Sequence, residues 1–128
     1  MRTIFLPLIA AFTLFATPSL AETWPSKDGE AVLKDFTFVS GEKLPEVRMH
    51  YTTLGTPHKD KKGQIDNAIM VLHGTGGSGK QFLQPQFADE LYGPGQPLDI
   101  AKYYIILPDN IGHGGSSKPS DGMRKIGR

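Results

Sequence analysis

Residues 68–80 read Ala-Ile-Met-Val-Leu-His-Gly-Thr-Gly-Gly-Ser-Gly-Lys, an uninterrupted apolar run that ends in a glycine-rich loop. Such a run between loop signals is typical of a strand buried on both faces of a mostly parallel sheet. A second apolar run covers residues 103–107. Between the two, residues 81–92 carry a helical stripe of apolar side chains that is broken by Pro85. This order of strand, loop, helix and strand predicts a right-handed parallel crossover and hence an α/β fold.

The residues before this unit predict an antiparallel hairpin. Phe36 and Phe38 alternate with polar residues over residues 33–39, and residues 47–52 alternate in the same way. This period of two is typical of half-buried strands. Residues 40–43, between the two segments, are polar and contain a glycine, so they are the predicted turn. The hairpin therefore leads into the mostly parallel sheet.

The amino terminus has the features of a secretory signal peptide. Arg2 gives a positive start, residues 4–16 are mostly apolar, and Ser19 and Ala21 are the small residues that a signal peptidase recognises. The apolar run is shorter than the roughly 20 residues that span a bilayer. We therefore expect residues 1–21 to be removed, leaving an exported, periplasmic or extracellular protein with no stable membrane anchor.

The expected mature chain begins with an irregular lead-in, residues 22–31, because this stretch is polar and contains Pro25 and Gly29. Residues 32–128 then form one α/β domain. The whole chain has 14 basic and 13 acidic residues, without the basic patch that nucleic-acid binding requires. It has no cysteine, which excludes a thiolate nucleophile and a disulfide framework.

Residues 74–80 admit three interpretations. The first is a phosphate-binding loop for a nucleotide, because Gly74, Gly79 and Lys80 have the required spacing. Gln81 follows the lysine, however, where a serine or threonine hydroxyl would bind magnesium, and this makes nucleotide binding a remote alternative. The second is an oxyanion loop, and the third is a glycine-rich turn without chemistry.

An oxyanion loop needs glycines because side chains would crowd the backbone N–H groups that point at the developing negative charge. One such donor typically contributes about 3 kcal/mol of transition-state stabilisation in acyl transfer. A His-Gly pair directly after a buried strand, here His73 and Gly74, is the arrangement of oxyanion loops in enzymes that cleave esters. Its position suits chemistry, since ligands of open α/β sheets lie beyond the carboxyl ends of the strands.

Residues 107–119 read Leu-Pro-Asp-Asn-Ile-Gly-His-Gly-Gly-Ser-Ser-Lys-Pro and follow the second apolar run. Together with the His-Gly loop, they resemble the amino-terminal part of α/β-hydrolase-fold enzymes, and more narrowly the homoserine O-acetyltransferase-like branch. The likeness extends over residues 35–121. Further points of similarity lie in residues 40–45, 51–55, 67–73 and 93–103.

The resemblance implies a serine nucleophile that forms an acyl-enzyme with a small-molecule ester or acyl substrate, without a cofactor. Carried over by position, the backbone N–H of Thr75 is one oxyanion donor. His73, Gly74 and Gly76 then shape the loop. In such enzymes the second donor and the catalytic triad lie further along the chain.

The nucleophile that this family requires is missing from the sequence. Its serine stands in a Gly-x-Ser-x-Gly elbow, and no such elbow occurs here. Ser78 precedes Gly79 and Lys80, and Ser116 and Ser117 lie in a predicted exposed turn. The sequence therefore contains no predicted nucleophile, acid or base.

Two histidines and an aspartate, His73, His113 and Asp109, stand near the ends of the predicted strands. No activated serine accompanies them, so they do not make a triad. Their spacing matches no recognised metal-ligand pattern, and no metal site is predicted.

The leading hypothesis is therefore an exported member of this family, with ester or acyl hydrolysis or acyl transfer as its chemistry, of which this chain contributes the oxyanion loop. The domain is expected to be truncated, because residues 122–128 depart from the family pattern. The alternative is a catalytically inactive fragment or a binding module. An incomplete sheet would leave residues 69–72 as an unpaired apolar edge, which predicts poor stability.

Overall fold

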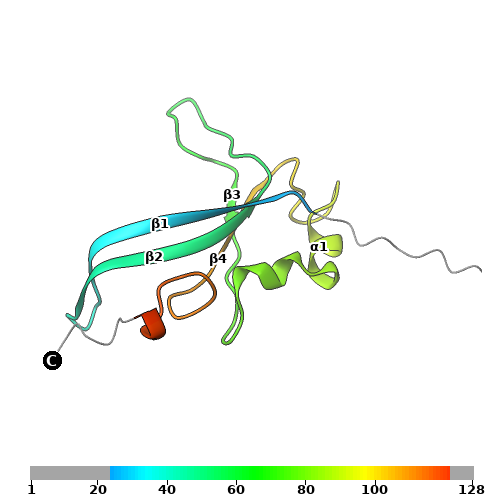
Figure 1. The fold of residues 1–128 in the computed structure, drawn as a ribbon. Coiled ribbons are helices and arrows are strands. Elements are labelled where there is room, and N and C mark those ends of the chain that lie inside the picture. Colours follow the sequence, from blue (N-terminus) through cyan, green and yellow to red (C-terminus); the bar gives the residue numbers. More distant parts are fainter. Residues whose placement is uncertain (1–23, 122–128) are drawn as a thin grey trace, which may run out of the picture.

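The computed structural model of the chain describes residues 24–121, and the expected signal peptide lies outside them. A four-stranded sheet with the order β1-β2-β4-β3 forms its centre (Figure 1). The strands are β1 (Ser26–Thr37), β2 (Lys43–Leu54), β3 (Ala68–Met70) and β4 (Tyr104–Pro108). An antiparallel hairpin thus leads into a parallel pair, as the sequence predicts for this α/β fold.

The hairpin of β1 and β2 is long, and in it every residue of β1 except Asp35 pairs with β2. Its register runs from Ser26 opposite Leu54 to Thr37 opposite Lys43, so residues 40–42 of the predicted turn lie between the strands and Lys43 already begins β2. The expectation of an irregular lead-in is wrong for residues 26–31, because β1 already begins at Ser26. These residues are polar and carry no apolar pattern. They are extended because their backbone pairs with β2.

The parallel pair consists of β3 and β4, with Ile69 opposite Ile105, while β2 pairs with the other edge of β4. The crossover between them contains a 3-10 helix, η1 (Gly79–Leu83), and the helix α1 (Pro85–Leu91). Pro85 does not break a helix here but begins one, since the first position of a helix needs no N–H donor. A second 3-10 helix, η2 (Pro119–Asp121), follows the loop after β4.

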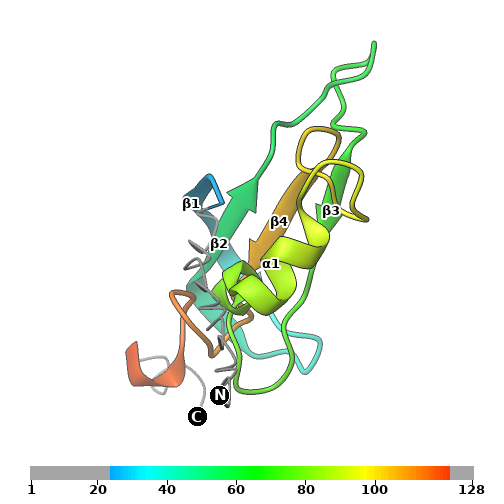
Figure 2. The same ribbon diagram turned by 90° about the vertical axis from the view of Figure 1, so that its right-hand side faces the viewer.

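Helix α1 covers one face of the sheet, as Figure 2 shows in the view where it lies in front of β4. Leu54, Ile105 and Leu107 point to this face and pack with Ala88 and Tyr92, and each of the five is at most 1% exposed. Their contacts form the core of the described residues. Burial raises the pKa of the Tyr92 hydroxyl to about 12.

The opposite face of the sheet is open, so the expectation of strands buried on both faces is wrong for the described residues. Met70 and Leu72 are each 60% exposed. They line a shallow, mainly apolar groove of about 430 Å³ with side chains of the other three strands, among them Tyr51, Tyr104 and Ile106. Within residues 24–121, no helix is long and apolar enough to cross a membrane.

Candidate functional site

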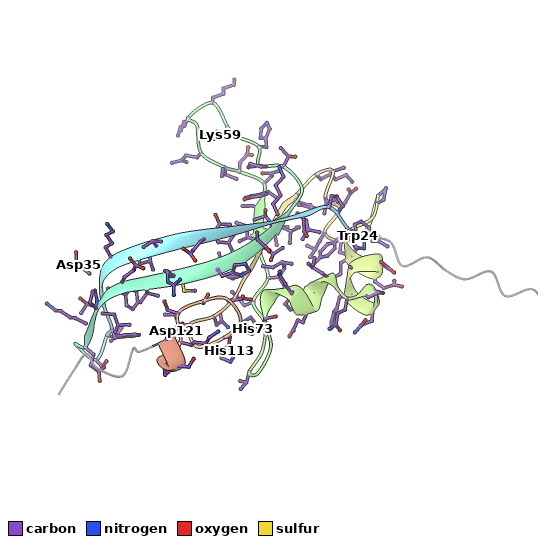
Figure 3. The ribbon with its side chains drawn as sticks, in the orientation of Figure 1. Trp24, Asp35, Lys59, His73, His113 and Asp121 are labelled. Carbon is purple, nitrogen blue, oxygen red and sulfur yellow. The ribbon has the colours of Figure 1, made fainter. Side chains whose placement is uncertain are left out.

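Two loops meet at the carboxyl ends of the parallel strands. Residues 71–78 follow β3, and residues 109–118 follow β4. His73 on the first loop and His113 on the second lie side by side in Figure 3, with ring centroids 5.2 Å apart. The segment with the predicted oxyanion donor is therefore in the position where α/β sheets bind their ligands.

His73 ties the first loop to the second. Its side chain is buried, its Nε2 accepts the backbone N–H of Asn110 at 3.0 Å, and its Nδ1 lies 2.8 Å from the carbonyl oxygen of Gly74. Nε2 must carry a lone pair to accept, and Nδ1 must carry the proton to donate. These contacts select the neutral Nδ1–H tautomer and give His73 the loop-shaping position that the sequence predicts.

Thr75 and Gly76 form the exposed tip of the loop. Gly76 has a φ of +79°, a conformation that suits glycine, and its N–H faces Nε2 of His113 at 3.4 Å. The N–H of Gly77 donates back to the carbonyl oxygen of Gly74 at 3.1 Å. The N–H of Thr75 donates to no other described residue. A free N–H at an exposed tip suits an oxyanion donor, and that role stays a prediction.

Asp109 holds the other end of the loop. Asp109 is only 3% exposed, and its carboxylate accepts the N–H of Gly79 on Oδ1 and the N–H of Gly115 on Oδ2, each at 2.8 Å. Nδ1 of His50 donates to Oδ2 at 2.9 Å. Burial opposes ionisation, but the Gly115 and Gly79 donors and His50 outweigh it and hold the pKa of Asp109 below its ordinary value.

A chain of polar contacts continues from His50 to the edge of the sheet. Its Nε2 lies 3.7 Å from Oδ1 of Asp28, and Oδ2 of Asp28 accepts Nζ of Lys80 at 3.1 Å. Hydrogen bonds from Thr52 and Lys80 lower the pKa of Asp28. Two of the groups that a phosphate-binding loop would use, the lysine ammonium and the Gly79 N–H, thus contact carboxylates of the chain itself.

Ser116 and Ser117 are buried, so the expectation of an exposed turn is wrong. Ser116 is fully buried, accepts the N–H of His50 at 2.9 Å and donates to the carbonyl oxygen of Asp109 at 2.6 Å. Ser117 accepts the N–H of Arg48 at 2.9 Å. Both hydroxyls accept backbone N–H groups of β2 and so bind the second loop to this strand, and neither is available as a nucleophile.

His73 and His113 lie side by side, but the carboxylate of Asp109 is not part of this pair. Asp109 contacts His50 instead, a strand residue to which the sequence assigns no role. A period-two pattern places His50 on a face of β2 but contains no information on its partner. A signal was nevertheless present, because an aspartate and two serines flank Gly112, Gly114 and Gly115, which let the chain turn tightly.

Curated relatives of the chain carry the names of acyltransferases. A probable acyltransferase of Methanothermobacter thermautotrophicus is 34% identical over 88 residues, which are 69% of this chain and 26% of the relative. A homoserine O-acetyltransferase of Methanohalobium evestigatum is 35% identical over 94 residues, which are 68% of this chain and 18% of the relative. No protein-family model matches the chain.

Solved structures add esterases to these relatives. An acetylester hydrolase from Corynebacterium glutamicum matches with a TM-score of 0.59 and 26% identity, over 73% of this chain and 24% of that protein. A homoserine O-acetyltransferase from Bacillus anthracis matches with a TM-score of 0.54 and 27% identity, over 67% of this chain and 24% of that protein. The chain spans about a quarter or less of the length of these proteins. It belongs to the α/β-hydrolase-fold superfamily, in the homoserine O-acetyltransferase-like branch.

Proposed function

We propose that the chain supplies the oxyanion loop of a serine-dependent esterase or acyltransferase site. The observation that carries this proposal is the exposed N–H of Thr75, which donates to no other described residue and lies beyond the carboxyl end of β3. A preorganised N–H in this position stabilises the oxyanion that forms when a nucleophile attacks an acyl carbonyl. His73, Gly74 and Gly76 give the loop the shape that presents this group.

The proposed substrate is a small ester or another acyl compound. The named relatives include acetyltransferases and an acetylester hydrolase, whose reactions share attack on an acyl carbonyl. Export would separate the protein from cytosolic acetyl-coenzyme A and therefore favours hydrolysis over acetyl transfer. No nucleic acid or cofactor takes part in this proposal.

The described residues do not supply the nucleophile. Ser116 and Ser117 are buried and hydrogen-bonded to the backbone, and Ser78 stands next to the 3-10 helix η1 rather than on a strand-to-helix elbow. The second candidate function, an inactive fragment or a binding module, is favoured by this observation. For residues 24–121 acting alone we expect no ester turnover.

Nucleotide binding at residues 74–80 is the weaker alternative. Lys80 is engaged with Asp28, and the Gly79 N–H is engaged with Asp109. A phosphate would have to displace both carboxylates, one of which is buried. A short 3-10 helix follows the loop, in place of the long helix whose amino terminus normally completes a phosphate site.

A graft tests the proposal. Residues 24–121 would replace the matching segment of the Corynebacterium glutamicum acetylester hydrolase, and the rest of that enzyme would stay unchanged. We expect the graft to hydrolyse a short-chain nitrophenyl ester well above buffer, provided that circular dichroism shows a cooperative fold. A folded graft without turnover would favour the inactive alternative. The ungrafted chain is the matched control and should not turn over the ester.

A further inference from the structure

The loop that carries Thr75 is anchored at both ends by two consecutive residues of the neighbouring loop. Asn110 donates to His73 at the beginning of the loop, and Asp109 accepts from Gly79 at its end. We propose that Asp109 is a positioning residue, whose buried carboxylate sets the orientation of the Thr75 N–H through Gly79. This inference rests on the proposed function, because it explains how the oxyanion loop keeps its shape.

The carboxylate of Asp109 joins three separate segments. Gly79 belongs to the crossover after β3, Gly115 to the loop after β4, and His50 to β2. An ionised carboxylate can accept several donors at once, and hydrogen bonds to it are about twice as strong as those between neutral groups. Removing it would leave donors unpaired in all three segments, so no neighbouring group can take over its role unchanged.

Glycines near Asp109 let the backbone approach its carboxylate closely. A side chain on Gly79 would collide with the carbonyl oxygen of Leu107 in β4, and one on Gly114 would collide with the Asp109 carboxylate itself. Glycine at position 79 therefore lets the end of the loop approach both β4 and Asp109. The tip, by contrast, has open space around Gly74 and Gly76. The ends of the loop are fixed, whereas its tip is free to receive a ligand.

Asp99 provides a matched control within the same chain. It is 4% exposed and accepts the N–H groups of Gly95 and Ala101, each at 2.9 Å. These hydrogen bonds lower its pKa, as those of Asp109 do. The side chain of Asp99 contacts only the segment between α1 and β4. Its loss therefore removes a similar set of hydrogen bonds and leaves those of the oxyanion loop in place.

The test is nuclear magnetic resonance on the full chain, with Asp109→Ala compared with Asp99→Ala. Residual dipolar couplings measure the orientation of the Thr75 and Gly76 N–H vectors, a readout that a uniform loss of stability does not change. We expect both couplings to change in Asp109→Ala and to match the wild type in Asp99→Ala. Hydrogen exchange at Gly79 should accelerate about tenfold or more in Asp109→Ala alone. Unchanged couplings in a folded Asp109→Ala variant would overturn the proposal.

If Asp109→Ala does not fold, order parameters of the wild-type chain still test the proposal. A loop held at both ends should show backbone order parameters of about 0.85 for residues 75–78, the value of rigid backbone, and values below about 0.6 would overturn the proposal. None of these measurements requires ester turnover. A graft without activity would therefore contradict the proposed function and leave the positioning role of Asp109 standing.

Discussion

The Nε2 atom of His73 accepts the backbone N–H of Asn110 at 3.0 Å and so joins the loops that follow the two parallel strands. The histidine is 5% exposed, and its other nitrogen is occupied by the carbonyl oxygen of Gly74. The imidazole therefore links the two loops, and both of its nitrogens are hydrogen-bonded. In this conformation it has no free nitrogen that could act as a general base.

Replacing His73 with alanine should destabilise the fold by about 1–3 kcal/mol, because the Asn110 N–H loses its acceptor in a partly buried place. Urea unfolding of the full chain measures this change. His58→Ala is the control, since the His58 ring is exposed and pairs only with exposed Asp66. That variant should remain within about 0.5 kcal/mol of the wild type. Equal effects of the two substitutions would contradict a cross-linking role for His73.

Gly79→Ala should also destabilise the chain, by about 1–3 kcal/mol, because the added methyl group meets the β4 backbone at Leu107. Gly74→Ala is its counterpart in the same loop. No atom lies within 4 Å of an added Cβ at Gly74, so we expect little change there. Thermal unfolding of the Gly79→Ala and Gly74→Ala variants measures the difference between them. A lower midpoint for Gly74→Ala than for Gly79→Ala would contradict the described packing.

Acidification should destabilise the chain through Asp109. Its pKa in the folded chain lies below the ordinary 3.8, so the unfolded state binds the proton more readily. The resulting stability is complete at neutral pH and is lost as the pH falls below about 5. Urea unfolding at a series of pH values should show this loss, with a shallower slope for Asp109→Asn. An unchanged slope in that variant would mean that other groups carry the acid dependence.

Expression from the native start should yield a chain that begins at Glu22, because Ser19 and Ala21 mark the proposed signal-peptidase site. Mass spectrometry of the periplasmic or secreted fraction measures the cleaved mass. Ala21→Arg removes the small residue at the cleavage position and should leave the precursor uncut. A full-length wild-type chain in the cytosol would contradict export.

Much of the fold could be predicted from the sequence, because its apolar residues follow clear periods. The alternation over residues 33–39 indicates the end of β1, which stops at Thr37, and the apolar run from Ala68 indicates β3. The start of β1 at Ser26 could not be predicted in this way. Its first residues are polar, and the hydrogen bonds with β2 that hold them lie far away in the sequence.

The candidate site was predictable in its position but not in its connections. A His-Gly pair after an apolar run places the loop, since strand ends and glycines are visible in the sequence. The role of Asp109 depends on His50 and Gly79, which lie 59 and 30 residues away. Ser116 was expected in an exposed turn for the same reason, because its partners on β2 and at Asp109 are set by the tertiary fold.

The most direct measurement is the kcat of the grafted acetylester hydrolase with Thr75→Pro beside the same graft with Thr75→Ala. Proline removes the backbone N–H, whereas alanine keeps it and removes only the side chain. Loss of one oxyanion donor predicts a kcat about 10²–10³-fold lower for Thr75→Pro, with Thr75→Ala close to the unmodified graft. Equal kcat values for the two folded variants would contradict the assignment of Thr75 as the oxyanion donor.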